Sequence, residues 1–209
     1  TRAGLDARAH VCDVRDPAAI ARTAAAVRDG LGEVSLLINS AGYARHTLFV
    51  DHDVADIEAM MQTNYMGTVH WIKQLLPDMR KNRQGWIVNV SSFAGRIGQA
   101  DEVAYSASKF AVTGLSEGLF QELAPLGIRV NAVAPGEIET EMISADYEPL
   151  VARIPMQRMG TTDEVAGAGC TGDTLVSIEV DQCPAAPVVA TPAAVPVGSP
   201  LVLVLLALG

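Results

Sequence analysis

Residues 85–110 read GWIVNVSSFAGRIGQADEVAYSASKF, and two patterns follow one another within them. The first is a nearly continuous apolar run, Trp86–Ser91, which is typical of a strand whose two faces are both covered. The second is an amphipathic pattern from about Tyr105 to Leu123. Its apolar residues are expected on one buried stripe: Phe110, Leu115, Leu119 and Leu123. A buried strand followed by such a helix is the repeating unit of parallel α/β sheets.

The same alternation extends outward on both sides of this stretch. Three further apolar runs are predicted as strands: Ala9–Val14, Val34–Asn39 and Ile128–Ala134. Two further helices are predicted, one from Asp16-Pro17 to Gly30 or Gly32, and one from Asp51 or Asp53 until Pro77 and Gly85. The sequence therefore predicts an α/β fold, with a doubly wound parallel sheet in three α/β/α layers.

The composition narrows the possible functions. The 209 residues are 49% hydrophobic and 19% charged, with a formal net charge of −9, which fits one globular domain and excludes collagen-like, coiled-coil and wholly disordered chains. No run of Lys or Arg is available to neutralise a row of phosphates, so nucleic acid is not an expected partner. From Gln182 onward the only continuous apolar run is Leu201–Gly209, too short for a bilayer span of about 20 residues. No membrane association and no metal site is predicted.

The cysteines and the two ends of the sequence suggest a compartment and a boundary. Cys12, Cys170 and Cys183 form an odd set without C-x-x-C spacing, and the N-terminus has no charged-then-apolar leader, so we expect the cytoplasm. The character of the sequence changes after Ala168. Residues 1–168 are predicted to form the folded domain and residues 169–209 a low-complexity tail rich in Ala, Val and Pro, either disordered, packed as one or two strands, or the product of a shifted reading frame.

The end of one strand and the start of one helix carry the candidate chemistry. Tyr105 and Lys109 are four residues apart, which places the phenol and the ammonium about one turn from each other on one helix face. A tyrosine that exchanges protons near neutral pH needs a cation nearby, because its ordinary pKa is about 10. Ser92 follows the strand Trp86–Ser91, at the edge where open α/β sheets bind ligands. Taken alone, each feature is also compatible with a structural role, as a buried ring beside a solvated charge and as a turn serine.

Other positions are ambiguous from the residues alone. Asn39-Ser40-Ala41-Gly42 is either a strand end whose small residues let backbone approach a nucleotide, or an ordinary turn. Asn64 lies within an apolar helical pattern, where an amide is either a polar core group that bends the helix or a group that holds a water in a relay. His46 and Phe49 lie on the loop that follows Gly42 and are either surface residues or substrate contacts.

Six motifs in this order resemble those of the short-chain dehydrogenase/reductase family. They are Cys12–Val14 (CDV), Asn39–Gly42 (NSAG), Thr63–Gly67 (TNYMG), Ile87–Ser92 (IVNVSS), Tyr105–Lys109 (YSASK) and Pro135–Thr140 (PGEIET), and the resemblance covers about residues 9–168. Within the family the likeness is to the 3-oxoacyl-(acyl-carrier-protein) reductases. It implies a Rossmann-type domain, NAD or NADP as cofactor, and interconversion of a secondary alcohol and a ketone by hydride transfer.

The resemblance also implies roles for individual residues. Tyr105 would be the general acid or base at the substrate oxygen, and Lys109 would lower its pKa and bind the nicotinamide ribose. Ser92 would polarise the carbonyl, and Asn64 would hold a water in a proton path to solvent. The cofactor would be lined by Tyr105 and Lys109, by Asp13 at the adenine amino group with Val14 beside the ring, by Asn39, Ala41 and Gly42 near the adenosine ribose, and by Pro135, Gly136, Ile138 and Thr140 at the nicotinamide.

The sequence departs from the family pattern at both ends. Nothing before Asp13 reads Thr-Gly-x-x-x-Gly-x-Gly, the turn that takes a pyrophosphate at a helix N-terminus. The first two strand-helix units and the last strand of the family are not recognised, and two of those strands would lie between the strands that end at Asp13 and Asn39. We therefore expect this polypeptide alone to bind NAD(H) or NADP(H) poorly or not at all. A non-catalytic remnant of the family is the alternative to an active enzyme.

A serine hydrolase is the remaining alternative. Residues 114–118 fit Gly-x-Ser-x-Gly, and Ser106 with Lys109 fits Ser-x-x-Lys, but Ser116 lies within a predicted helix and all four histidines precede it, unlike in α/β-hydrolases.

The expected substrate is a small alcohol or ketone under the segment 141–155, whose apolar residues favour an apolar or mixed ligand. Helix pairing as in the family, over Ile57–Met79 and Tyr105–Leu123, implies a homodimer or homotetramer.

Overall fold

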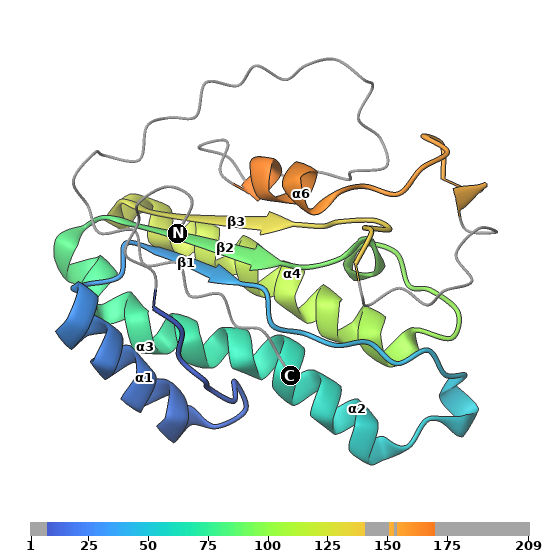
Figure 1. The fold of residues 1–209 in the computed structure, drawn as a ribbon, viewed down its shortest axis with the longest axis horizontal. Helices are drawn as coiled ribbons and strands as arrows, with labels where there is room; N and C mark the ends of the chain where they lie inside the picture. Colours follow the sequence, from blue (N-terminus) through green and yellow to red (C-terminus); the bar gives the residue numbers. More distant parts are fainter. Residues whose placement is uncertain (1–7, 141–150, 153, 170–209) are drawn as a thin grey trace.

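The computed structural model describes residues 8–140, 151–152 and 154–169. In this part of the chain the sheet has three parallel strands in the order β1-β2-β3, namely β1 (Leu36–Asn39), β2 (Gly85–Val90) and β3 (Ile128–Val133). The three arrows point the same way in Figure 1. Most residues of β2 and β3 are buried on both faces, which explains their nearly unbroken apolar sequences.

Three of the four predicted strands are confirmed, and one is wrong. The runs 34–39, 86–91 and 128–134 contain β1, β2 and β3 to within a few residues. The run 9–14 forms no strand, because an extended segment becomes a strand only where a neighbour pairs with its backbone. No described strand lies beside it, and β1 is an edge of the described sheet.

The helices begin where the capping residues predict. α1 has Asp16 as its N-cap, with the carboxylate accepting a hydrogen bond from the Ala18 N–H at 2.8 Å, and it ends at Gly32 with φ 92°. Asp53 caps α2 in the same way. The described helices are α1 (Pro17–Leu31), α2 (Val54–Met61), α3 (Gly67–Asn82), α4 (Val103–Leu123) and α6 (Thr162–Gly169), with short turns η1 (Phe49–Asp51), η3 (Phe93–Gly95) and η4 (Ala124–Leu126).

The second predicted helix is interrupted, although not at its proline. Pro77 lies inside α3, which continues to Asn82 and is capped by Arg83 in the left-handed conformation. The interruption is a π-helical turn, η2 (Gln62–Met66), between α2 and α3. Single π turns inside helices occur mostly where a side chain must be re-aimed, often at functional sites, and η2 contains Asn64.

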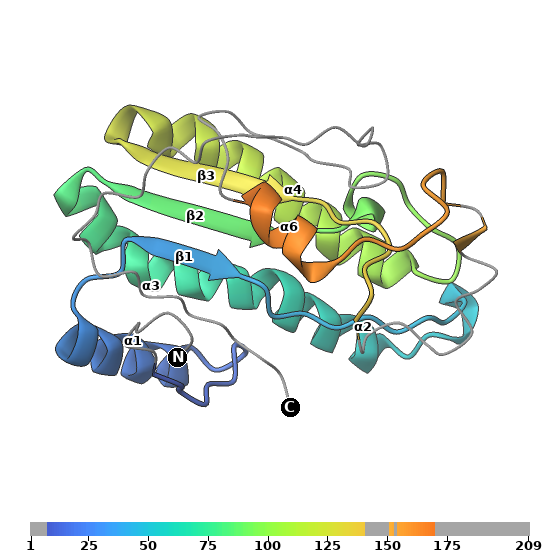
Figure 2. The same ribbon diagram turned by 45° about the horizontal axis from the view of Figure 1, so that its top comes forward.

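The helices cover both faces of the sheet. α3 and α4 pack on one face, α6 lies over β3 on the other, and α1 packs against α3. Figures 1 and 2 show this arrangement from two directions. The predicted α/β fold, a parallel sheet between helical layers, is confirmed.

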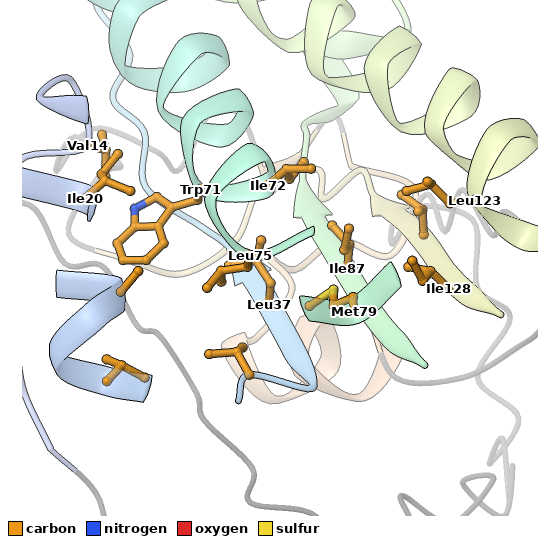
Figure 3. Close-up of a cluster of buried hydrophobic side chains, with 14 residues drawn as sticks. Val14, Ile20, Leu37, Trp71, Ile72, Leu75, Met79, Ile87, Leu123 and Ile128 are labelled. Carbon is orange, nitrogen blue, oxygen red and sulfur yellow. The ribbon is translucent and has the colours of Figure 1, made fainter. Parts of the chain in front are cut away.

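The largest apolar cluster lies between α1, α3 and the sheet. Figure 3 shows Trp71 of α3 beside Val14 and Ile20, and Leu37 and Ile87 beneath α3. A side chain at Gly67 would place its Cβ 2.8 Å from the Val14 side chain, so α3 must begin with glycine for the segment before α1 to pack this closely.

The buried stripe predicted on α4 is correct at its C-terminal end but not at Phe110. Leu123 is buried and Leu115 and Leu119 pack against the core, whereas Phe110 is 45% exposed. The N-terminal half of α4 buries Ser106, Ser108 and Lys109, besides Val112. Most of the side chains that enter the protein there are therefore polar, and apolar periodicity does not report them.

Several predictions concern residues outside the described part of the chain. These are the tail from residue 170 onward, with Cys170 and Cys183, and residues 141–150 of the expected substrate segment. Within the described part, the helices are all too short or too polar to cross a membrane.

Candidate active site

The predicted site residues lie where the three strands end. β1 leads into Gly42, β2 into Ser92 and β3 into Pro135, and the heads of the arrows face the same edge in Figure 1. The backbone ties two of these exits together, because the N–H of Phe93 donates to the Pro135 carbonyl at 2.8 Å. α4 packs against η3, which brings Tyr105 to the same edge.

Ser92 and Tyr105 lie near each other at the strand ends. Ser92 caps η3, where its Oγ accepts the Ala94 N–H at 3.2 Å, and its side chain is close enough to the Tyr105 phenol to affect the pKa of that phenol. Burial raises the pKa of Tyr105 above its usual range. The Ser92 side chain acts in the opposite sense, and the carboxylates of Glu102 and Glu137 add to the rise. The structure thus brings together the residues predicted as proton donor and as carbonyl ligand.

Lys109 is buried below Tyr105 rather than solvated. Its side chain is 5% exposed, its Nζ donates to the Val90 carbonyl at 2.8 Å, and the Nζ lies 5.7 Å from the centre of the Tyr105 ring. Loss of hydration lowers the pKa of Lys109 to about 8. This differs from the expectation that the ammonium makes the phenol more acidic, because an amine with this pKa is mostly neutral before a phenol with a raised pKa ionises.

Asn64 is fully buried in η2 and uses its amide within the protein. Its Nδ2 donates to the Tyr43 carbonyl and to Ser108 Oγ, both at 3.0 Å, and its Oδ1 accepts the Tyr43 N–H at 3.0 Å. A Cβ on Gly42 would lie 3.0 Å from Asn64 Oδ1 and 3.4 Å from Lys109 Nζ. The amide therefore joins η2, α4 and the loop after β1, as a polar core group. A role in a water relay stays a prediction.

A buried chain of polar side chains, which the sequence did not predict, crosses the sheet behind the site. Asn39 Nδ2 donates to Asn89 Oδ1 at 2.8 Å, Asn89 Nδ2 donates to Ser116 Oγ at 2.9 Å, and Ser116 donates to the Val112 carbonyl at 2.7 Å. The sequence feature that could have indicated this network is the asparagine within each of two apolar strands. Ser116 is completely buried in mid-helix, which contradicts a role as an exposed hydrolase nucleophile.

A second unpredicted network fixes η3 against α4. Ser91 Oγ donates to the Lys109 carbonyl at 3.0 Å and lies 2.8 Å from Thr113 Oγ1, which bonds the same carbonyl at 3.1 Å. Gly95 packs directly on this network, since a Cβ there would lie 2.5 Å from Ser91 Oγ and 2.8 Å from the Lys109 carbonyl oxygen. The relative position of Ser92 and Tyr105 therefore depends on Gly95.

The side chains expected at the adenosine end of the cofactor form contacts with other residues of the protein. The Asp13 carboxylate pairs with Arg15 at 2.8 Å, and hydrogen bonds from Arg15 lower its pKa. Val14 is 1% exposed and packs in the core. The Asn39 amide donates to Asn89. Their contact with the adenosine of a cofactor stays a prediction. Ala41 is half-buried beside the core.

The residues expected at the nicotinamide end form the loop after β3. Ile138 makes an isolated parallel bridge with Gly160, whose N–H donates to the Glu137 carbonyl at 2.9 Å. Pro135 and Gly136 are half-buried near η3, and Thr140 is exposed. These bonds join the loop to Gly160, and the bond from Phe93 to the Pro135 carbonyl holds its start beside η3.

The model of the family described as short chain dehydrogenase matches residues 1–149. Nodulation protein G of Azospirillum brasilense is 38% identical over 160 residues, which are 75% of this chain and 65% of that protein. The 3-oxoacyl-(acyl-carrier-protein) reductase FabG of Vibrio cholerae is 34% identical over 169 residues, 79% of this chain and 69% of that protein. The chain thus spans about two thirds of the length of the curated relatives it matches.

Solved structures give the same assignment. ElxO with NADP bound has a TM-score of 0.73 and 31% identity, covering 80% of this chain and 74% of that one. An NAD+-bound xylitol dehydrogenase has a TM-score of 0.74 and 30% identity, covering 80% of this chain and 72% of that one. With the family model matched over most of the chain and the Ser, Tyr and Lys side chains gathered at the strand ends, the chain belongs to the short-chain dehydrogenase family.

Proposed function

We propose that this chain carries the catalytic part of an NAD(P)-dependent oxidoreductase that interconverts a secondary alcohol and a ketone. The single observation that supports this best is that Ser92, Tyr105 and the buried Lys109 gather at the ends of the parallel strands, with Lys109 Nζ 5.7 Å from the centre of the Tyr105 ring. A phenol and a serine hydroxyl that lie side by side can both form a hydrogen bond with one substrate oxygen. That arrangement suits proton transfer at a carbonyl or carbinol.

The residues divide the work as follows. Tyr105 gives its proton to a carbonyl oxygen in the reductive direction, or takes the hydroxyl proton in the oxidative direction. Ser92 donates a hydrogen bond to the same oxygen and so stabilises its developing negative charge. Lys109 lies near Tyr105 and the Gly42 backbone, and Asn64 holds the next residue of that loop through hydrogen bonds with the Tyr43 backbone. When bound, the nicotinamide supplies or accepts the hydride.

The side chains fit the nicotinamide half of a dinucleotide. Lys109 Nζ lies 5.7 Å from the centre of the Tyr105 ring and 3.4 Å from the position that a Cβ on Gly42 would take, so it lies between the phenol and the loop after β1. Relatives in the family have been solved with NADP and with NAD+ bound, and we extend one or the other cofactor to this chain. The adenosine half fits less well, since the Val14 and Asn39 side chains are turned into the protein and Asp13 is paired with Arg15.

This second point favours one other candidate function, a non-catalytic member of the family. A chain whose adenosine-binding side chains are used internally would keep the catalytic residues but hold no cofactor.

The test compares the 209-residue chain with a chimera in which the first strand-turn-helix units of Vibrio cholerae FabG precede residue 8. Oxidation of NADH or NADPH at 340 nm is followed with a panel of ketones, in each protein and in its Tyr105→Phe variant. We expect turnover in the chimera and its loss by at least about 10²-fold on removal of the phenol. Turnover that survives Tyr105→Phe would refute the role of Tyr105. A folded chimera that binds neither NADH nor NADPH and shows no turnover would favour the non-catalytic alternative.

A further inference from the structure

Ser108 has no part in the reaction proposed above, yet it lies between Tyr105 and Lys109 in the sequence and is completely buried in α4. Its Oγ donates to the Tyr105 carbonyl at 2.7 Å and accepts a hydrogen bond from Asn64 Nδ2 at 3.0 Å. The direction of both bonds is fixed, because a serine hydroxyl has one proton and a carbonyl can only accept. The hydroxyl therefore links the π-helical turn η2 to the first turn of α4.

The amide of Asn64 has one orientation that satisfies its surroundings. Its two N–H groups donate to Ser108 Oγ and to the Tyr43 carbonyl, both at 3.0 Å, and its Oδ1 accepts the Tyr43 N–H at 3.0 Å. A flipped amide would turn its oxygen toward the Tyr43 carbonyl, which has no proton to offer. Because Asn64 is 1% exposed, bulk water is not available to replace a lost partner. Two different elements thus hold the same amide.

Ser108 is the residue that connects this amide to α4. Tyr43 follows Gly42 in the loop after β1, so its two bonds fasten Asn64 to that loop. Of the hydrogen bonds that the amide forms with described residues, the one to Ser108 reaches α4. The next residue of α4, Lys109, has its Nζ 3.4 Å from the position that a Cβ on Gly42 would take. The link through Ser108 therefore spans the two segments that face each other at the site.

We propose that Ser108 is a positioning residue of this site: by linking the Asn64 amide to the Tyr105 carbonyl, it fixes the turn that carries Tyr105 and Lys109 against the loop after β1. The catalytic meaning of this inference rests on the proposed function. A small displacement of this turn changes the distance from the phenol to the substrate oxygen, and catalytic rates depend steeply on such distances. Loss of the link lowers kcat rather than substrate binding, because the completely buried Ser108 does not touch the substrate.

The first experiment measures the link in the 209-residue chain without cofactor. Ser108→Ala removes the hydroxyl and keeps a residue of high helix propensity. Hydrogen exchange at the Tyr43 amide, followed by NMR, reports how firmly Asn64 holds the loop after β1, and the amides of β2 and β3 report global unfolding. Ser106→Ala is the matched control: Ser106 is 4% exposed in the same stretch of α4, but its Oγ accepts the Gln99 N–H at 3.2 Å, from the loop before α4 rather than from η2.

We expect Ser108→Ala to raise the exchange rate of the Tyr43 amide about fivefold relative to the amides of β2 and β3, as the loss of one buried hydrogen bond implies. Ser106→Ala should leave this ratio unchanged, even if it lowers the overall stability. An unchanged ratio in Ser108→Ala, or an equal rise in Ser106→Ala, would overturn the proposal.

The second experiment separates this inference from the proposed function. In the chimera described above, we expect Ser108→Ala to lower kcat about fivefold or more and to leave the KM for the ketone within about twofold of its original value. An unchanged kcat, with or without a raised KM, would refute the positioning role. A chimera without turnover would contradict the proposed function, while the exchange ratio at Tyr43 still confirms or overturns the link through Ser108.

Discussion

Replacement of Gly95 by alanine tests how closely η3 must approach α4 for the site to form. The alanine Cβ would lie 2.5 Å from Ser91 Oγ and 2.8 Å from the Lys109 carbonyl oxygen, both far inside van der Waals contact. Ser91 cannot rotate away freely, because its Oγ bonds both the Lys109 carbonyl at 3.0 Å and Thr113 at 2.8 Å. The clash is relieved only when η3 moves or when this network breaks.

The expected loss of stability follows from these two routes. Overpacking of a filled interior costs about 1–3 kcal/mol, and a lost buried hydrogen bond adds about 1 kcal/mol. We therefore expect Gly95→Ala to lower the free energy of unfolding by about 2–4 kcal/mol. Gly114→Ala is the matched control, because nothing lies within 4 Å of its Cβ position in α4. It should raise stability by about 0.5–1 kcal/mol, as alanine favours a helix.

Urea unfolding of the 209-residue chain, followed by far-UV circular dichroism, measures both variants without any cofactor. The dependence of the unfolding free energy on urea concentration should be the same in each variant, so that the urea midpoints can be compared directly. If Gly95→Ala unfolds at the same urea concentration as the wild type or as Gly114→Ala, then η3 does not rest on the Lys109 backbone. The account of how Ser92 is held against Tyr105 would then be wrong.

Three further predictions follow from the buried polar groups. Ser116→Ala leaves Asn89 Nδ2 without its 2.9 Å partner and should cost about 1–3 kcal/mol in urea unfolding; a loss below about 0.5 kcal/mol would contradict a buried network. Lys109 has a folded pKa of about 8 against an ordinary value of 10.5, so the unfolded chain binds more protons between these pH values. Stability should therefore rise across this window by about 3 kcal/mol relative to Lys109→Met, and a pH-independent difference would refute it. Finally, NADH and NADPH should bind the 209-residue chain weakly in a nicotinamide fluorescence titration, because Val14 and Asn39 face the interior; saturation at micromolar cofactor would disprove this.

The parts of the site that the sequence predicted well depend on local spacing. Tyr105 and Lys109 share a helix face because a helix repeats about every four residues, wherever that helix packs. Ser92 lies at the end of β2 because the apolar run before it stops there. Pro17 and Gly32 mark the ends of α1 for similarly local reasons. None of these features requires knowledge of a distant partner.

The parts that the sequence did not predict depend on partners far along the chain. Residues 9–14 have the composition of a strand, but no neighbour in the described sheet pairs with them. Asn39 has the residue type of a ligand contact, but Asn89 lies beside it in the register of β1 and β2 and takes its amide. Val14 was predicted beside an adenine ring, but its side chain packs against the start of α3 at Gly67. Whether such a side chain points into the protein therefore depends on packing partners that are distant in the sequence.

Tyr105 and Lys109 show why a correct spacing still gave the wrong electrostatic expectation. Four residues on a helix fix where two side chains start, whereas their pKa values depend on how much water each retains. Burial against Val90 takes water from Lys109, so its ammonium form is destabilised, and burial beside Glu102 and Glu137 disfavours the phenolate. Both effects act against the phenolate, because Lys109 loses its charge above about pH 8, before a phenol with a raised pKa ionises. Near neutral pH the site therefore holds Tyr105 with its proton, ready to donate it.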